Sequence, residues 1–338
     1  GGSYYVPKPV YSGLTRITEF PDDYYYTTAI SDSAVSFVRE HPADVPMFLY
    51  VAHYAPHLPL HAPKQRVDAC RERYKAGYDI LRRQRFERQK ACGLVKKSME
   101  LPVYQREFND QRPSWTDLTA WTELSLRQQE QWINDMATYA AMIEIMDDGI
   151  GRLIEAVKEK GIYENTVFLF MSDNGATSEG GYLGQLMADL SNTPYRSYKQ
   201  WCFQGGTSSP LIIKCGDSVK RGIKEKGTIC REPGHIIDLF PTCLDMASVR
   251  YPSSFQGEKV KLSGTSLLPA IQNKKLCSRD LFFEHQTSCA VISDGWKLVR
   301  ANGKSSWELI NLSEDPFEEK DLSAQYPEKV KSLEKKWN

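Results

Sequence analysis

The chain has 338 residues, and its 43 lysine and arginine residues are balanced by 43 aspartate and glutamate residues, so the formal net charge is zero. A neutral chain has no overall field that attracts nucleic acid or an anionic membrane, which disfavours nucleic-acid binding. The longest apolar runs are a few residues long, far below the ~18 needed to cross a bilayer, so no transmembrane segment is expected. The length suits one large domain with a smaller one attached.

The first part of the chain predicts a short helix and a buried strand. Residues 1–28 are interrupted by prolines and are expected to be extended, after which Ser31 and Asp32 are candidates to cap a helix. The run 46–53 is continuously apolar, as in parallel strands that are buried on both faces. Residues 54–63 contain three prolines and are expected to form a loop at the strand's carboxyl end, where open α/β sheets place ligands.

Residues 64–97 are expected to be helical and are strongly basic, with 12 lysine and arginine residues against four acidic ones. The ordinary interpretation is a solvated helix face. The alternative is a surface that faces polyanionic glycans.

The centre of the chain alternates helical and strand patterns. From Asp135, apolar residues recur at three- and four-residue steps and predict a long amphipathic helix that ends near Gly161. Strands are predicted over 165–172 and 209–215, followed by a helix over 235–247 whose inward residues are Ile236, Leu239, Phe240 and Leu244. Helix followed by parallel strand is therefore the expected repeating unit.

After Pro252, short apolar runs separated by turn residues predict an antiparallel meander with a terminal helix from about Pro327. The predicted fold class is therefore α/β, with a mixed, mainly parallel sheet flanked by helices. The predicted division is a partial catalytic domain over 1–250 and a small antiparallel C-terminal subdomain over 251–338.

Asp173 and Asn174 stand at the end of the second predicted strand and present carboxylate and amide oxygens side by side. Such oxygens suit a hard cation, Ca²⁺ or Mg²⁺, although two ligands are too few for a site. The alternative interpretation is an Asx turn that closes the strand.

Two further residues are candidates for contact with an anion. His53, His57 and His61 recur every four residues, but the intervening prolines exclude a helical metal face. A histidine of this loop remains a candidate general acid or anion contact, against an ordinary structural role. Lys199 lies among aromatic residues just before the strand over 209–215, so its ammonium group is either aimed at an anion or simply solvated.

The order of these motifs resembles the sulfatase family of the alkaline-phosphatase-like superfamily. The landmarks, in chain order, are residues 48–63, 136–142 with Met146-Asp147, 172–176, the loop from Lys199 through Gly205-Gly206 to Ser209-Pro210, 234–242, Glu284-His285, and 295–299 followed by Trp307-Glu-Leu. The resemblance extends from about Phe48 to the C-terminus, and it is nearest to arylsulfatase-type enzymes that also act on sulfated sugars.

The resemblance implies that Asp173 and Asn174 are the second half of a calcium site, and that His57 and Lys199 contact the sulfate oxygens or the departing alcohol. The family's nucleophile is a formylglycine made from the cysteine of a C-x-P-x-R or C-x-A-x-R motif, which this sequence lacks. We expect that motif in an N-terminal segment outside this sequence. Glu284 and His285 are expected at the rim of the pocket, where they help select a sugar.

The expected function is thus hydrolysis of the sulfate monoester of a sugar or aryl alcohol, with Ca²⁺ as cofactor, in the periplasm or outside the cell. The chain alone is expected to be inactive. The alternatives are a phosphodiesterase or phosphonate hydrolase of the same superfamily, and a non-catalytic protein that binds sulfated glycans. The eight cysteines form no C-x-x-C pair and permit disulfides without requiring them, and the oligomeric state stays open.

Overall fold

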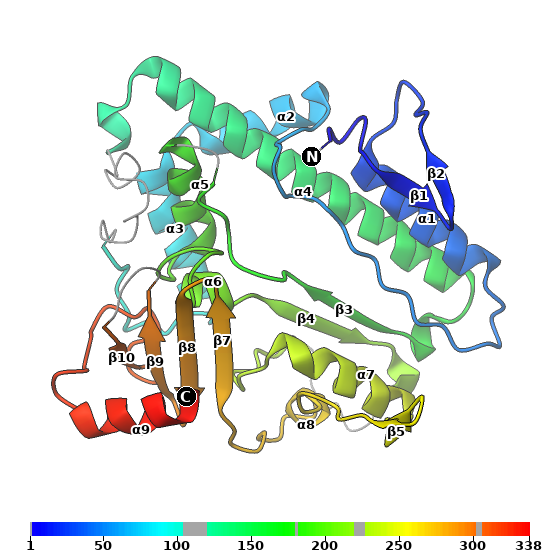
Figure 1. The fold of residues 1–338 in the computed structure, drawn as a ribbon. Helices are drawn as coiled ribbons and strands as arrows, with labels where there is room; N and C mark the ends of the chain where they lie inside the picture. The colour runs from blue at the N-terminus through cyan, green and yellow to red at the C-terminus, as the bar shows by residue number, and fades with distance from the viewer. Residues whose placement is uncertain (1, 104–119, 180–181, 220–226, 302–305) are drawn as a thin grey trace.

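The structure, a computed structural model, describes residues 2–103, 120–179, 182–219, 227–301 and 306–338 (Figure 1). Its α-helices are α1 (Tyr26–Glu40), α2 (Lys64–Arg71), α3 (Tyr78–Ala91), α4 (Leu126–Glu159), α5 (Tyr182–Asn192), α6 (Gln204–Thr207), α7 (Leu239–Ala247), α8 (Leu268–Ile271) and α9 (Pro327–Trp337). Its strands are β1 (Val10–Ser12), β2 (Thr15–Ile17), β3 (Val167–Met171), β4 (Leu211–Cys215), β5 (Ser254–Phe255), β6 (Glu258–Lys259), β7 (Leu281–His285), β8 (Ser288–Ser293), β9 (Trp296–Arg300) and β10 (Glu308–Asn311).

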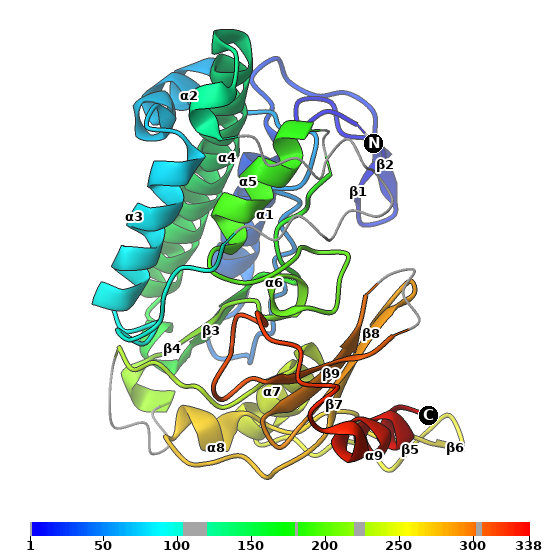
Figure 2. The same ribbon diagram turned by 90° about the vertical axis from the view of Figure 1, so that its left-hand side faces the viewer.

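The predicted long helix is confirmed as α4, but it begins nine residues before Asp135. A capping box fixes its start: the Ser125 hydroxyl accepts a hydrogen bond from the Gln128 backbone N–H, and the Gln128 side chain accepts one from the Ser125 N–H. Figures 1 and 2 show α1, α2 and α3 gathered around α4. Apolar side chains of α1 and α2 pack on α4, so this helix is the core of the larger part of the molecule.

The predicted cap of the first helix is wrong. Helix α1 begins at Tyr26, so Ser31 and Asp32 lie inside it, and the buried Ser31 hydroxyl donates a hydrogen bond to the Thr27 carbonyl at 3.1 Å. A serine that bonds to the carbonyl four residues earlier satisfies its hydroxyl without ending the helix, so a polar residue alone does not mark a helix start.

The strands predicted over 165–172 and 209–215 are confirmed as β3 and β4, which pair in antiparallel register from Val167↔Cys215 to Met171↔Leu211. The expected mainly parallel sheet is not confirmed, because every strand pair in the described ranges is antiparallel. The α/β content itself is present, with helices packed against a short central ladder.

The strand predicted over 46–53 is wrong: within the described residues this segment joins no strand ladder. Met47 and Leu49 still pack in a cluster with Phe168 of β3, while Phe48 and Tyr50 are 79% and 80% exposed. Alternate residues therefore lie on a covered and an open face, as in a strand. An apolar run supplies the side chains of a strand, but a neighbouring backbone must supply the hydrogen bonds.

The helix predicted over 235–247 is confirmed as a short 3₁₀ turn over Ile236–Asp238 followed by α7. Its expected inward face is partly wrong, because Ile236 and Phe240 are each 54% exposed, whereas Pro241 and Thr242 are buried. Both exposed side chains are large and apolar, like Phe48 and Tyr50.

The antiparallel meander and the terminal helix are confirmed. The sheet has the order β10-β9-β8-β7, and Leu333 of α9 packs on one of its faces. The predicted turn at Asp294-Gly295 is present, with φ values of 49° and 79°. The predicted turn at Asn302-Gly303 lies outside the described residues. Figure 2 shows the sheet and α9 together at the end of the molecule away from α2.

All eight cysteines are free thiols. No helix in the described ranges is long and apolar enough to cross a membrane.

Candidate functional site

The turn that follows β3 presents Asp173 and Asn174 at its carboxyl end. Asp173 is exposed, and its Oδ1 accepts a hydrogen bond from Asn174 Nδ2 at 3.1 Å, while the Ser172 hydroxyl donates to the Asn174 carbonyl at 2.8 Å. The donor types fit Ca²⁺, which takes carboxylate and amide oxygens. The number falls short, because the described residues contain no group of three or more histidine, cysteine, aspartate and glutamate side chains placed to hold a metal.

The segment 196–206, which carries Lys199 and is called the Lys199 loop below, lies directly against this turn. The Lys199 N–H donates to the Ala176 carbonyl at 2.9 Å, and the Gly175 N–H donates to the Gly206 carbonyl at 3.1 Å. The approach is so close that a Cβ at Gly175 would lie 1.6 Å from the Gly205 carbonyl oxygen. Glycine at this turn therefore lets the two loops touch through their backbones.

Lys199 is half-buried, and its ammonium group has no ion-pair or hydrogen-bond partner in the part of the chain that the structure describes. The neighbouring Tyr198 and Trp201 are buried in the cluster beneath the loop. Lys199 thus contacts, through its own backbone, the residue that stands three positions after Asp173 in the chain. An ammonium group on this loop can neutralise part of the charge of a bound anion.

Tyr198 is held by Asp189 of α5, whose Oδ1 accepts a hydrogen bond from the tyrosine hydroxyl at 2.6 Å. Burial raises the pKa of Asp189 to about 7, although this hydrogen bond and the charge of Arg82 act in the opposite direction. The other oxygen, Oδ2, is buried without a partner in the described residues. Tyr198, which precedes Lys199, is therefore hydrogen-bonded to a carboxyl group whose pKa is close to neutral.

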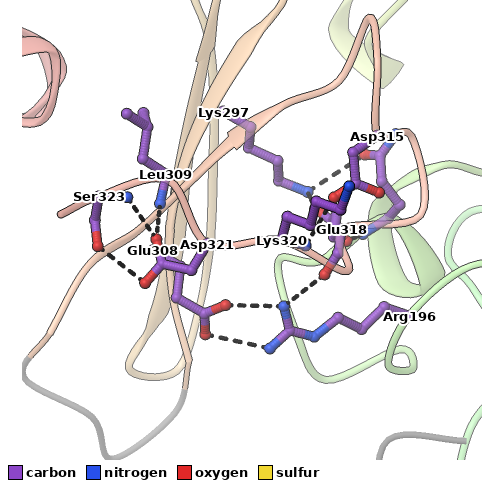
Figure 3. Close-up of polar contacts among 10 residues, drawn as sticks. Arg196, Lys297, Glu308, Leu309, Asp315, Glu318, Lys320, Asp321 and Ser323 are labelled. Carbon is purple, nitrogen blue, oxygen red and sulfur yellow. Dashed lines mark hydrogen bonds and ion pairs between the residues drawn. The ribbon is translucent and has the colours of Figure 1, made fainter. Parts of the chain in front are cut away.

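The C-terminal sheet supports the other end of the Lys199 loop (Figure 3). The Arg196 guanidinium donates to both carboxylate oxygens of Glu308, at 2.8 and 3.2 Å. The Gln204 N–H donates to Glu318 at 2.6 Å, and Glu318 forms an ion pair with Lys297 at 2.7 Å. Burial lowers the pKa of Lys297 and raises the pKa of Glu318, while their mutual attraction opposes both shifts.

Glu284 and His285 lie at the end of β7, exposed, at the turn into β8. This hairpin contacts the Lys199 loop, because the Cys202 N–H donates to the Ser288 hydroxyl at 3.0 Å. The structure therefore brings the two predicted sugar-contacting residues to the same loop that carries Lys199.

His57 lies in the proline-containing loop and is exposed. Its Nδ1 is 2.8 Å from the Leu58 carbonyl oxygen, and its ring stacks on Tyr54 with the centroids 5.1 Å apart. Since a carbonyl only accepts, Nδ1 carries the proton and Nε2 is left for other partners. Within the described ranges no hydrogen bond or ion pair joins His57 to the Asp173 turn or the Lys199 loop.

The basic segment 64–97 is largely helical, as expected, in α2 and α3. Several of its cations are paired with acidic side chains of α4: Arg66 with Asp148 at 2.7 Å, Arg71 with Glu130, and Arg73 with Glu144. These pairs occupy cations that a glycan would need, which favours the ordinary interpretation as a solvated helix face over the one as a glycan-binding surface.

Sequence reasoning missed the residues that hold the two loops: Asn192 and Asp189 at the end of α5, and the pair Lys297 and Glu318. One signal in the sequence could have indicated the ion pair. Lys297 is a charged residue within the Gly295–Val299 motif, next to buried apolar residues of β9.

Comparison with known proteins adds a family match. The Sulfatase family model matches residues 2–249. The chain is 27% identical to an uncharacterized sulfatase of Schizosaccharomyces pombe over 93% of this chain and 61% of that protein. It is 30% identical to the arylsulfatase of Klebsiella aerogenes over 77% of this chain and 58% of that protein. The chain thus spans about three fifths of the length of these relatives.

Solved structures share the fold. Ps i-CgsB in complex with k-i-k-neocarrahexaose superposes with a TM-score of 0.64 at 22% identity, over 98% of this chain and 58% of that chain. BT4656 in complex with D-glucosamine-2-N,6-O-disulfate superposes with a TM-score of 0.60 at 19% identity, over 99% and 72%. The family model covers most of the chain, and we conclude that the chain belongs to the sulfatase family.

Proposed function

We propose that the intact protein hydrolyses the sulfate monoester of a sugar or aryl alcohol, releasing the alcohol and sulfate. The observation that supports this most directly is the contact between the Asp173–Asn174 turn and the Lys199 loop. The Lys199 N–H donates to the carbonyl of Ala176, two residues after Asn174, so the segments that carry the carboxylate, the amide and the ammonium group touch close to the end of β3.

In this proposal each residue acts on a different part of the ester. The Lys199 ammonium neutralises the sulfate oxygens, on which negative charge is concentrated. For His57 to act as the acid, both ring nitrogens must carry a proton: Nδ1–H bonds to the Leu58 carbonyl, and the Nε2 proton passes to the departing alcohol oxygen, which leaves the neutral imidazole. Asp173 and Asn174 are two of the ligands of a Ca²⁺ ion, which when bound supplies positive charge to the sulfate oxygens.

The nucleophile is proposed to lie outside these 338 residues. The sequence has no C-x-P-x-R or C-x-A-x-R motif, and the chain spans about three fifths of its curated relatives. The exposed apolar side chains of the segment 46–53 and of β3 and β4, namely Phe48, Tyr50, Phe170 and Ile212, are consistent with further strands that complete a parallel sheet in the intact protein. We propose that this N-terminal part carries the formylglycine and the remaining calcium ligands.

Of the two proposed substrate classes, the sulfated carbohydrate is supported by the polar residues beside the Lys199 loop. Glu284 and His285 are exposed on the hairpin that touches the Lys199 loop, where polar side chains can accept or donate hydrogen bonds to sugar hydroxyls. BT4656, which shares the fold, is described with the substrate D-glucosamine-2-N,6-O-disulfate. We propose that the protein acts in the periplasm or outside the cell.

The test compares the intact protein with the 338-residue chain. We expect the intact protein to turn over an aryl sulfate and the chain alone to show activity near background, because groups that act as a unit lose nearly all catalysis together. The chain alone should also aggregate, since large apolar side chains stay exposed.

Three outcomes contradict parts of this proposal. Turnover by the chain alone contradicts the proposal that the nucleophile lies outside these 338 residues. Hydrolysis of a phosphodiester in preference to a sulfate ester by the intact protein assigns it to the other enzymes of the superfamily. Binding of a sulfated glycan without any turnover by the intact protein identifies a non-catalytic binding protein.

A further inference from the structure

Asn192, the last residue of α5, contacts both loops of the candidate site through one side chain. Its Oδ1 accepts a hydrogen bond from the Ala176 N–H at 2.9 Å. Its Nδ2 donates to the Ser197 carbonyl at 2.9 Å and to the Gly205 carbonyl at 2.8 Å. One amide group therefore satisfies one backbone donor of the Asp173 turn and two backbone acceptors of the Lys199 loop.

These three bonds require an amide. A carboxylate offers the acceptor but no hydrogen for the two carbonyls, and an aliphatic side chain offers neither. Two of the backbone partners belong to the loop: Ser197, which adopts a left-handed φ of 65°, and Gly205 of α6. The third, Ala176, belongs to the turn, and the Asn192 bonds lie beside the direct backbone bonds from Lys199 to Ala176 and from Gly175 to Gly206. A side chain that completes the hydrogen bonds of both loops sets the distance between them.

We infer that Asn192 is a positioning residue that fixes the Asp173–Asn174 turn relative to Lys199. This inference rests on the proposed function for its catalytic consequence, although the coupling of the two loops is a property of the chain itself. Asn192 reaches only backbone atoms of the two loops and acts through the residues that they carry.

The first test is hydrogen exchange in the full-length protein, read on peptides that cover the turn 173–179 and the loop 196–206. In Asn192→Leu, which keeps the size but removes all three bonds, we expect exchange in both segments to accelerate together by about tenfold or more. In Asn192→Asp, the turn should keep its protection at Ala176 while the loop loses its own. Ser191→Ala is the matched control: the Ser191 hydroxyl bonds to the Met187 carbonyl and to the Tyr139 side chain, not to either segment, so exchange in both segments should stay unchanged.

The second test is turnover of an aryl sulfate by the same proteins. We expect Asn192→Leu and Asn192→Asp to lower kcat by about 10²-fold with a smaller change in KM, because displacement of reacting groups by about 1 Å has effects of that size. Thermal unfolding of each variant separates this effect from a general loss of folding. If Asn192→Leu does not fold, Asn192→Asp decides the question alone.

The outcomes are separable. Unchanged exchange in both segments of Asn192→Leu, or acceleration in only one of them, overturns the inference, and so does normal kcat in both variants of an active enzyme. A wild-type protein without sulfatase activity refutes the proposed function instead. Exchange then still decides whether Asn192 couples the loops.

Discussion

Lys297 and Glu318 form an ion pair of 2.7 Å in which neither side chain is exposed to solvent. Lys297 lies on β9, and Glu318 follows β10 and bonds to the backbone of Gln204. The pair therefore links the C-terminal sheet to the loop that carries Lys199 through two fully buried charged side chains.

Removal of one partner should be costly. Glu318→Leu leaves a buried ammonium group without its carboxylate, and we expect a loss of about 3–5 kcal/mol in the free energy of unfolding. The double variant Lys297→Met with Glu318→Leu should recover much of this loss, because no unpaired charge remains. Urea denaturation measures both. The control is the exposed pair Lys331 and Glu328, whose removal by Lys331→Ala should change stability by less than about 1 kcal/mol.

Asp189 predicts a dependence of stability on pH. Its pKa of about 7 in the folded state exceeds the ordinary value of 3.8, so between these values the folded protein holds a proton that the unfolded chain has released. The free energy of unfolding should therefore fall as pH rises from about 4 to about 7, by at most roughly 4 kcal/mol from this group.

Asp189→Asn keeps an acceptor for the Tyr198 hydroxyl and is neutral at every pH, so its stability should fall less over this range. Urea denaturation at about pH 5 and about pH 8 provides the comparison. Asp22→Asn, on the exposed N-terminal segment, should keep the slope of the wild type. Parallel curves for Asp189→Asn and the wild type would show that the Asp189 carboxyl is ionised in the folded protein.

Asp173 predicts the metal content of the intact enzyme. Asp173→Ala removes a charged oxygen ligand, and we expect Ca²⁺ retained after gel filtration to fall by about tenfold or more, with activity falling in proportion. Asp22→Ala, an exposed carboxylate in the N-terminal segment, is the control. Wild-type Ca²⁺ content in Asp173→Ala would leave this residue with a structural role in the turn, such as the hydrogen bond that it accepts from the Asn174 side chain.

His57 and Lys199 are predicted to act on the ester directly. His57→Ala and Lys199→Ala should each lower kcat by about 10²-fold or more while thermal unfolding stays near that of the wild type. His41→Ala and Lys214→Ala remove the same groups elsewhere and should have little effect on turnover. Near-normal kcat in both site variants would return the two residues to structural or solvated roles.

The sequence predicted most elements whose signal is local. The steps of the apolar residues after Asp135 predicted α4, and the turn residues Asp294-Gly295 predicted a hairpin of the C-terminal sheet. The start of α4 was placed too late, because its first two turns are mostly polar and the capping box at Ser125 was not used.

Features that depend on distant partners were not predictable from local pattern. The run 46–53 has the composition of a buried strand, but pairing requires another backbone, and none of the described strands supplies it. The same holds for the site. Asp173, Asn174 and Lys199 lie in recognisable motifs, whereas Asn192 stands in no motif and gains its role only because the ends of α5, the turn and the loop converge.

The contact between Gly175 and Gly205 has a consequence for how this protein tolerates change. A methyl group at Gly175 would meet the Gly205 carbonyl at 1.6 Å, and one at Gly205 would meet the Ser197 carbonyl at 2.0 Å. In a library of all single substitutions, these two positions should therefore be among the most intolerant of the chain. Related sequences can therefore vary the side chains around the site, but they must keep glycine at both positions to preserve this crossing of the main chain.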